Sequence, residues 1–123
     1  MWGGKKILII DDEPAFSEML KLRLEANGYQ VETAPDGASG LEKAAQSQPG
    51  LILLDVVMPG LDGFETLRRL HRDPGTSRIP VVMLTARGEF KSITQAQQLG
   101  AADYLIKPPE TNTLLQLVQR YVR

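Results

Sequence analysis

The sequence contains no cysteine, which excludes disulfide bonds and thiolate metal sites. A chain without cysteine suits a reducing compartment, so we expect the protein in the cytoplasm. Long apolar runs are also missing, because none approaches the roughly 20 residues of a membrane-spanning helix. Residues 1–4 do not resemble a secretory signal; we interpret them as a flexible N-terminal extension and expect no association with a membrane.

An excess of charge of either sign is absent too. The formal net charge is −1, and lysine and arginine occur at most as adjacent pairs. Domains that bind nucleic acid usually carry a concentrated basic patch, so we expect no direct binding to nucleic acid. A length of 123 residues with 42% hydrophobic and 24% charged residues is ordinary for one globular domain. We therefore predict a single domain over residues 1–123.

Apolar segments of strand length recur along the chain. Three of them consist almost entirely of Ile, Leu, Val and Met, which is typical of strands buried on both faces. These three segments span residues 5–10, 51–55 and 79–85. Residues 29–34 alternate apolar and polar side chains, as an edge strand does. Residues 102–107 form the fifth predicted strand.

Segments with apolar residues at helical spacing follow each predicted strand. They cover residues 14–28, 36–47, 62–73, 90–100 and 110–122. Pro14 suits the first turn of a helix, and Asp36 and Asp62 are suitable N-caps for the second and third helices. Strands that alternate with helices indicate a parallel sheet covered on both faces. We predict an α/β fold, a doubly wound five-stranded parallel sheet flanked by five helices.

Acidic residues stand at the ends of two buried strands. Asp11 and Asp12 follow the first strand, and Asp55 ends the third. Ligands of open parallel sheets bind beyond the carboxyl ends of the strands, so these acids converge if the two strands are neighbours. Two carboxylates about 4 Å apart repel by roughly 4 kcal/mol at an effective dielectric constant near 20. A cation must offset this repulsion, and an all-oxygen ligand set favours Mg²⁺.

Two further polar residues end the remaining strands. Thr85 closes the fourth strand and Lys107 closes the fifth. Three acids, a hydroxyl, an ammonium group and a divalent ion together indicate a phosphoryl site. Asp55 is the expected acceptor, because a carboxylate can form an acyl phosphate.

Each of these residues alone has an ordinary explanation. An aspartate after a strand is usually a cap or a turn former. Glu13 is expected only to favour the dipole of the helix that begins at Pro14. Only the coincidence of suitable residues at the ends of four different strands indicates a site.

Four motifs, in this order, carry a family resemblance: "ILIIDDEP", "LILLDVVMPGLDG", "VVMLTA" and "ADYLIKPP". With them the chain resembles the receiver domains of two-component response regulators, and the chemotaxis-type single-domain regulators in particular. The resemblance extends from about Lys5 to Val122. It implies a flavodoxin-like fold with strand order 2-1-3-4-5.

The resemblance also implies roles for the acidic residues. Asp55 would accept a phosphoryl group from a histidine kinase or a phosphotransfer protein. Asp12 and Asp55 would bind Mg²⁺ directly, together with the backbone carbonyl of Val57, and Asp11 would act partly through water. The domain would then be a signalling switch rather than an enzyme with an external substrate.

Other implied roles concern the switch. Thr85 and Lys107 would contact the phosphoryl group, and the Lys107–Pro108 peptide bond would be cis. Movement of Thr85 would let Tyr104 turn inward. This movement would alter the fourth helix, fifth strand and fifth helix, near Phe90, Lys91, Gln95, Tyr104 and Gln116. That surface would bind a downstream protein or an output domain, with the chain a monomer or a phosphorylation-dependent dimer.

Some positions depart from the family pattern or are unspecific. Pro109 stands where many relatives carry a bulky apolar residue. Val57 and Arg87 occupy positions that influence the lifetime of the phosphoryl group, and because Val57 cannot orient a water molecule we expect slow self-dephosphorylation. His71, at the end of a predicted helix, is expected to face solvent.

Two other classes of function remain open at this point. One is a binding module of the same fold that works without phosphorylation; the presence of every expected site residue argues against it. The other is a Mg²⁺-dependent phosphohydrolase with an aspartyl-phosphate intermediate. Such an enzyme needs a second acid near its nucleophile, but position 57 is valine, and no insertion is long enough to cover a substrate.

Overall fold

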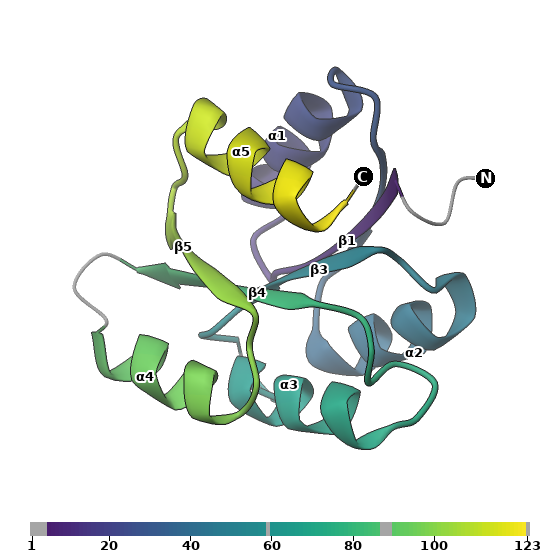
Figure 1. The fold of residues 1–123 in the computed structure, drawn as a ribbon, viewed down its shortest axis with the longest axis vertical. Coiled ribbons are helices and arrows are strands. Elements are labelled where there is room, and N and C mark those ends of the chain that lie inside the picture. Colours follow the sequence, from purple (N-terminus) through teal and green to yellow (C-terminus); the bar gives the residue numbers. More distant parts are fainter. Residues whose placement is uncertain (1–4, 59, 87–89, 123) are drawn as a thin grey trace.

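The computed structural model describes residues 5–58, 60–86 and 90–122. The predicted extension at residues 1–4 therefore lies outside the described residues. Strands and helices alternate throughout (Figure 1). The strands are β1 (Lys6–Ile10), β2 (Gln30–Ala34), β3 (Leu51–Asp55), β4 (Val81–Ala86) and β5 (Asp103–Lys107). The helices are α1 (Pro14–Glu25), α2 (Gly37–Ser47), α3 (Gly63–Arg72), α4 (Phe90–Gln98) and α5 (Thr111–Tyr121).

All described strands belong to one parallel sheet with the order β2-β1-β3-β4-β5. This order confirms the predicted fold class, and it confirms the alternating segment β2 as an edge strand. The two strands that carry the acidic residues, β1 and β3, are neighbours, with Ile10 beside Leu54. Further along the sheet, Asp55 pairs with Leu84, and Ala86 pairs with Lys107. The predicted site residues therefore meet at one edge.

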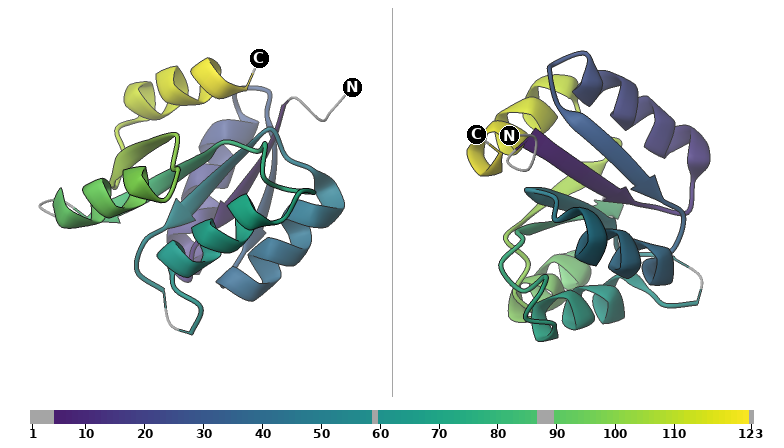
Figure 2. Two further views of the ribbon diagram at one scale, coloured as in Figure 1. Left: turned by 60° about the horizontal axis from the view of Figure 1, so that its bottom comes forward. Right: turned by 90° about the vertical axis from the view of Figure 1, so that its right-hand side faces the viewer.

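Helices cover both faces of the sheet. In Figure 1, α1 and α5 lie above it and α2, α3 and α4 lie below, and Figure 2 shows the same layers from two other sides. The alternation of side chains along β1 explains this arrangement. Ile7 and Ile9 join the core under α1 and α5, whereas Leu8 and Ile10 join the core under the other three helices. The central strands are buried on both faces, as their unbroken apolar sequence predicts.

Helix termini agree with the sequence. Asp36 accepts a hydrogen bond from the Ser39 backbone N–H at 2.8 Å, and Asp62 accepts one from the Glu65 N–H at 2.8 Å. Both predicted N-caps are thus confirmed. Pro14 occupies the first turn of α1. In the described part of the chain, no helix has the length and apolarity needed to cross a lipid bilayer.

The position of His71 corrects one expectation. The sequence placed this residue in solvent, but its ring is half-buried, and Nε2 is fully buried without a hydrogen-bond partner among the described residues. The reason is the turn after α4, where Gly100 adopts a φ of +96°. A Cβ atom on Gly100 would lie 3.2 Å from Nε2, so the ring packs directly against this turn.

Gly63, the first residue of α3, packs directly against the backbone at the end of β3. Its N–H donates to the carbonyl of Val56 at 3.1 Å. A Cβ atom there would lie 2.3 Å from the carbonyl oxygen of Asp55, and backbone cannot move aside as a side chain can. Gly63→Ala should lower the free energy of unfolding by about 2 kcal/mol or more in urea denaturation.

Gly75→Ala is the matched control. A Cβ atom at Gly75 would lie 3.3 Å from Oδ1 of Asp73, an exposed side chain that can shift by the small distance required while it keeps its hydrogen bond from the Gly75 N–H. Its effect should stay within about 0.5 kcal/mol. Equal stability of the two variants would show that Gly63 does not fix α3 against the end of β3.

Candidate phosphoryl and metal site

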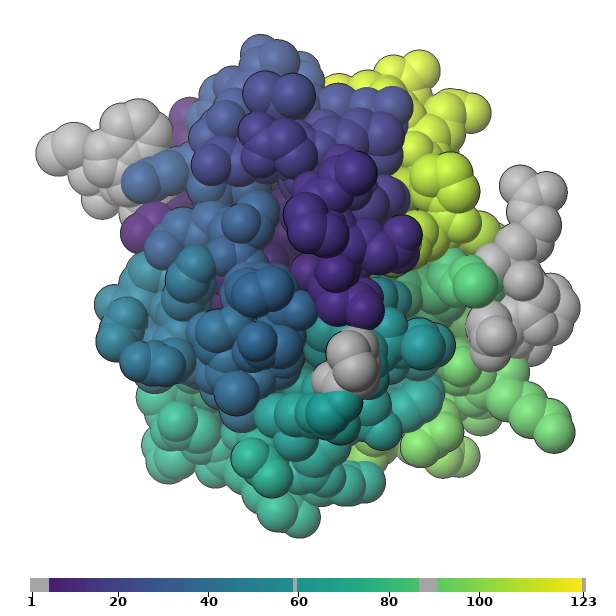
Figure 3. Space-filling view, turned by 180° about the vertical axis from the view of Figure 1, so that it is seen from behind, coloured from purple at the N-terminus to yellow at the C-terminus, as the bar shows by residue number. Residues whose placement is uncertain are grey.

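The carboxyl ends of the strands bring three acidic residues together. The side chains of Asp11, Asp12 and Asp55 offer ligand atoms within 4.8 Å of one another. Asp11 and Asp55 are buried, whereas Asp12 is exposed. Figure 3 shows that the first residues of α1, in dark purple, lie beside the segment that follows β3, in teal. The predicted convergence of the acids is thus confirmed.

The ammonium group of Lys107 enters this cluster from β5. Its Nζ lies 2.9 Å from Asp11 Oδ2 and 3.6 Å from Asp55 Oδ2. It also pairs with the carboxylate of Glu13 and lies 4.4 Å from the centre of the Phe16 ring. The peptide bond from Lys107 to Pro108 is cis, as predicted. Lys107 therefore supplies positive charge next to the predicted phosphoryl acceptor.

The role expected for Glu13 is wrong in one respect. The sequence suggested that this residue only favours the helix dipole, and it does stand at the N-cap position of α1. Its side chain makes no capping hydrogen bond and instead pairs with Lys107, 94 residues further along. No local pattern could reveal this pair, because two strands separate β1 from β5 in the sheet.

Thr85 contributes an unsatisfied hydroxyl group. The residue is 1% exposed, and Oγ1 has no hydrogen-bond partner within the described residues. A buried polar group without a partner usually costs 1–3 kcal/mol, so it calls for an explanation. Thr85 lines a cavity of about 310 Å³ together with Asp12, Asp55, Val57 and Lys107. A ligand oxygen in this cavity would provide the missing partner.

The pKa values follow from burial and neighbouring charge. Burial raises the pKa of Asp55 to about 6, the negative charge of Asp11 adds to this effect, and Lys107 opposes it. Burial disfavours the charge on Lys107. Hydrogen bonds to Glu13 and Asp11 and the attraction of Asp55 outweigh that effect, so the pKa of Lys107 is raised. The site therefore combines a firmly charged ammonium group with a carboxylate that is costly to ionise.

The donor set fits a hard divalent cation. Three carboxylates with an exposed member leave access for water, and Mg²⁺ typically combines one or two carboxylates with water and phosphate oxygens. The backbone N–H of Val57 donates to Asp55 Oδ1 at 3.4 Å, while its side chain is 70% exposed. The predicted ligand role of the Val57 carbonyl stays a prediction. Arg87, the other residue predicted to affect phosphoryl lifetime, lies outside the described residues.

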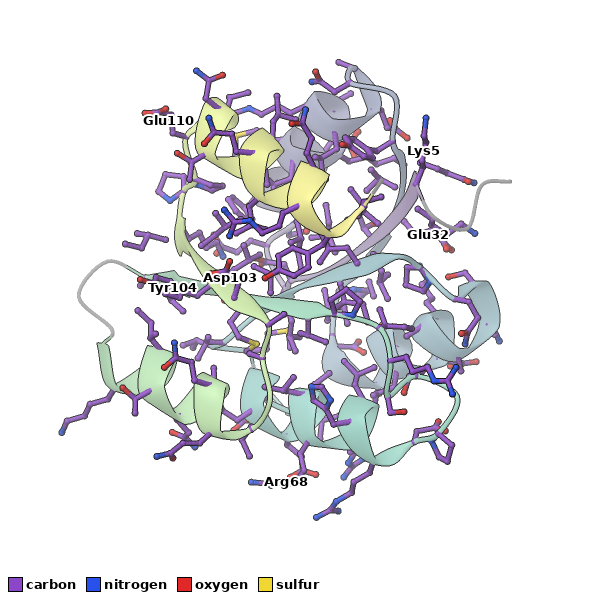
Figure 4. All side chains as sticks on the ribbon, in the orientation of Figure 1. Lys5, Glu32, Arg68, Asp103, Tyr104 and Glu110 are labelled. Carbon is purple, nitrogen blue, oxygen red and sulfur yellow. The ribbon has the colours of Figure 1, made fainter. Side chains whose placement is uncertain are left out.

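The predicted switch surface comprises α4, β5 and α5. Tyr104 is 38% exposed, and Lys91, Gln95 and Gln116 are exposed as well. Figure 4 shows Asp103 and Tyr104 on β5, on the side of the molecule where Glu110 precedes α5. The side chain of Phe90 lies outside the described part of the structure. A larger cavity of about 530 Å³ lies here between β5 and α5, away from the acid cluster.

The second proline after Lys107 also has a defined place. Pro109 is buried, and its carbonyl accepts a hydrogen bond from Arg23 of α1 at 3.4 Å. This hydrogen bond connects the loop after β5 to α1.

Comparison with known proteins gives a consistent result. Residues 7–119 match the family described as the response regulator receiver domain. Over 118 residues, which are 96% of this chain, the sequence is 46% identical to the DNA-binding dual master transcriptional regulator RpaA of Synechocystis. It spans only 49% of RpaA, about half the length of that protein.

Two further relatives match over nearly their whole length. Protein PilH of Pseudomonas aeruginosa is 41% identical over 113 residues, which cover 92% of this chain and 93% of PilH. A crystal structure of the receiver domain of the sensor histidine kinase PA1611 from the same species superimposes with a TM-score of 0.88. The two sequences are 29% identical, with 97% of this chain and 98% of that one covered. That structure has a magnesium ion coordinated in its active-site cleft.

Fold, strand order and site geometry agree with the match over residues 7–119 and with the near full-length similarity to PilH. The chain is therefore a member of the response regulator receiver domain family, and it works as a signalling switch.

Proposed function

We propose that this receiver domain accepts a phosphoryl group on Asp55 from the phosphohistidine of a histidine kinase or a phosphotransfer protein. One observation carries the proposal: the Asp55 carboxylate shares a cavity with the ammonium group of Lys107 and with the hydroxyl group of Thr85, which has no partner among the described residues. An acceptor, a hydrogen-bond donor and a cation are what a transferred phosphoryl group requires.

The chemistry of the transfer is simple. A carboxylate oxygen of Asp55 forms a bond to phosphorus, and the bond between phosphorus and the histidine nitrogen breaks. The electron pair stays on the imidazole of the donor protein. Lys107 then pairs with a phosphoryl oxygen, and the Thr85 hydroxyl group donates a hydrogen bond to another.

Mg²⁺ is the proposed cofactor. Asp12, Asp55 and the Val57 carbonyl would hold it directly, and Asp11 would act partly through water. When bound, the ion supplies positive charge beside the phosphoryl oxygens. The acid cluster in this chain and the magnesium ion in the PA1611 receiver domain support this assignment.

The proposed output is a change in the surface formed by α4, β5 and α5. Thr85 would move toward the phosphoryl group, and Tyr104 would turn into the space that it leaves. This surface would bind a downstream protein or an output domain, either as a monomer or as a phosphorylation-dependent dimer. We place the domain, over residues 1–123, in the cytoplasm with its kinase.

Phosphorylation can be tested by intact mass. Incubation with acetyl phosphate and Mg²⁺ should add one phosphoryl group, about 80 Da, to the wild type and none to Asp55→Asn. Asp36→Asn is the matched control, because it makes the same change at an exposed N-cap outside the site and should react like the wild type. A wild type that gains no mass would instead favour a binding module that works without phosphorylation.

Charge in the cluster should reduce stability when no metal ion is bound. The pKa of Asp55 is raised from 3.8 to about 6. Its ionisation therefore destabilises the folded state progressively as the pH rises from 3.8 to about 6, and fully at higher pH. Asp55→Asn should therefore raise the free energy of unfolding at pH 7.5 in a chelating buffer by about 1–3 kcal/mol. The gain should shrink as the pH falls through 6 and disappear below about 3.8, where the wild-type carboxyl group is protonated in both states.

Thermal unfolding with and without EDTA measures this effect. Glu42→Gln removes one negative charge from an exposed position on α2 and should leave the midpoint nearly unchanged. A loss of stability in Asp55→Asn at pH 7.5 would mean that the cluster is not repulsive in the metal-free protein.

The lifetime of the phosphoryl group should depend on Val57. Its exposed side chain lines the cavity beside Asp55 and cannot hydrogen-bond an attacking water molecule. We expect slow loss of the phosphoryl group, which Val57→Asn should accelerate severalfold and Val57→Leu should not. The decay of the phosphorylated mass after removal of acetyl phosphate measures the rate. A wild-type lifetime of seconds or less would contradict this expectation.

A further inference from the structure

The ammonium group of Lys107 has its closest partners on the side of α1. Asp11, Glu13 and Phe16 surround Nζ, and we refer to these three residues as the resting cradle. All three come from the turn after β1 and the beginning of α1. Asp55 is the most distant of the carboxylates that pair with Nζ, at 3.6 Å compared with 2.9 Å for Asp11. Lys107 therefore lies next to Asp55, but its closer contacts are with the resting cradle.

Within the resting cradle, Glu13 is the member that lines the cavity of Asp55 without belonging to the acid cluster. Its side chain does not cap α1, and it stands outside the cluster of Asp11, Asp12 and Asp55 that can hold a metal ion. Asp11, in contrast, belongs to that cluster and accepts a hydrogen bond from the backbone N–H of Glu13 at 2.8 Å. Removal of the Glu13 carboxylate therefore changes the environment of Lys107 without removing a predicted metal ligand.

We propose that Glu13 is a positioning residue that holds Lys107 in its resting place and competes with the phosphoryl group on Asp55 for the ammonium charge. This inference rests on the function proposed above. A movement of Nζ toward a phosphoryl oxygen on Asp55 lengthens its contact with Glu13. The phosphorylated state therefore forms at the expense of this ion pair, and Glu13 biases the domain toward the resting state.

The solvent exposure of Glu13 limits the strength of its ion pair with Lys107. The side chain of Glu13 is 62% exposed, compared with 16% for Lys107, so water screens the pair. Partly exposed ion pairs are typically worth less than about 1 kcal/mol. A phosphoryl group carries nearly two negative charges and three acceptor oxygens, so it can displace such a partner. Glu13 should therefore shift the balance between the two states by a factor of a few rather than by orders of magnitude.

Beryllofluoride, which binds carboxylates as a phosphoryl analogue, provides an equilibrium test. Its dissociation constant is measured at saturating Mg²⁺ for the wild type, Glu13→Gln, Lys107→Gln and the double variant. Glu13→Gln should bind beryllofluoride about three- to fivefold more tightly than the wild type. In the Lys107→Gln background the same change should have almost no effect, because the group for which Glu13 competes is gone.

Two controls separate this role from a general effect of charge. Glu18→Gln removes an exposed carboxylate from the same helix and should leave the dissociation constant nearly unchanged. In metal-free protein without beryllofluoride, the effects of Glu13→Gln and Lys107→Gln on the urea midpoint should be non-additive, because the two side chains contact each other.

The outcomes that overturn the inference are distinct. If Glu13→Gln tightens the binding of beryllofluoride equally in both backgrounds, the negative charge of Glu13 acts on the whole site and not through Lys107. An unchanged dissociation constant in Glu13→Gln would mean that it does not compete for Lys107. If the wild type itself binds no beryllofluoride, the proposed function fails, and the inference fails with it.

Discussion

The structure of this receiver domain is organised around negative charge that the fold concentrates at one edge of its sheet. Two buried carboxylates and an exposed one lie close together because β1 and β3 are neighbours and end at the same level. Such an arrangement is unfavourable unless cations offset it. In the described structure Lys107 provides this compensation, and its position on β5 links the far side of the sheet to the acids.

The elements that carry these charges are packed into the core. The central strands are buried on both faces, and the site residues extend from their ends. Gly63 lets α3 begin directly against the carbonyl of Asp55, and the N–H of Val57 donates to the Asp55 carboxylate. The hydroxyl group of Thr85, which has no hydrogen-bond partner in the part of the chain that the structure describes, lines the same cavity. A firm framework thus holds groups that are unsatisfied until a ligand arrives, which is the condition for a switch controlled by a local charge.

Much of this arrangement was predictable from the sequence because it depends on local patterns. Continuous apolar runs identified the buried strands, and the alternating pattern of residues 29–34 identified the edge strand β2. Asp36 and Asp62 were identified as N-caps from their positions before helical segments. The position of acids after strands predicted the cluster, while the order of the strands came from the family resemblance.

Other features depend on contacts between distant segments. Glu13 looked like a residue that serves only its own helix, but it pairs with a lysine on an edge strand. His71 looked exposed at the end of a helix, but the turn at Gly100 covers it. The bond from Arg23 to the carbonyl of Pro109 likewise joins α1 to a loop 86 residues away. Periodicity describes which face a residue occupies, and it contains no information about which distant side chain meets it there.

A titration of the metal-free protein with Mg²⁺, followed by amide NMR, shows whether the acid cluster holds the ion. We expect saturable binding of one ion that perturbs the amides of residues 11–13, 55–57 and 85, with the helices on both faces unaffected at their far ends. Asp55→Asn should weaken this binding. An absence of saturable binding, or perturbations centred elsewhere on the molecule, would contradict the claim that the acid cluster is the metal and phosphoryl site.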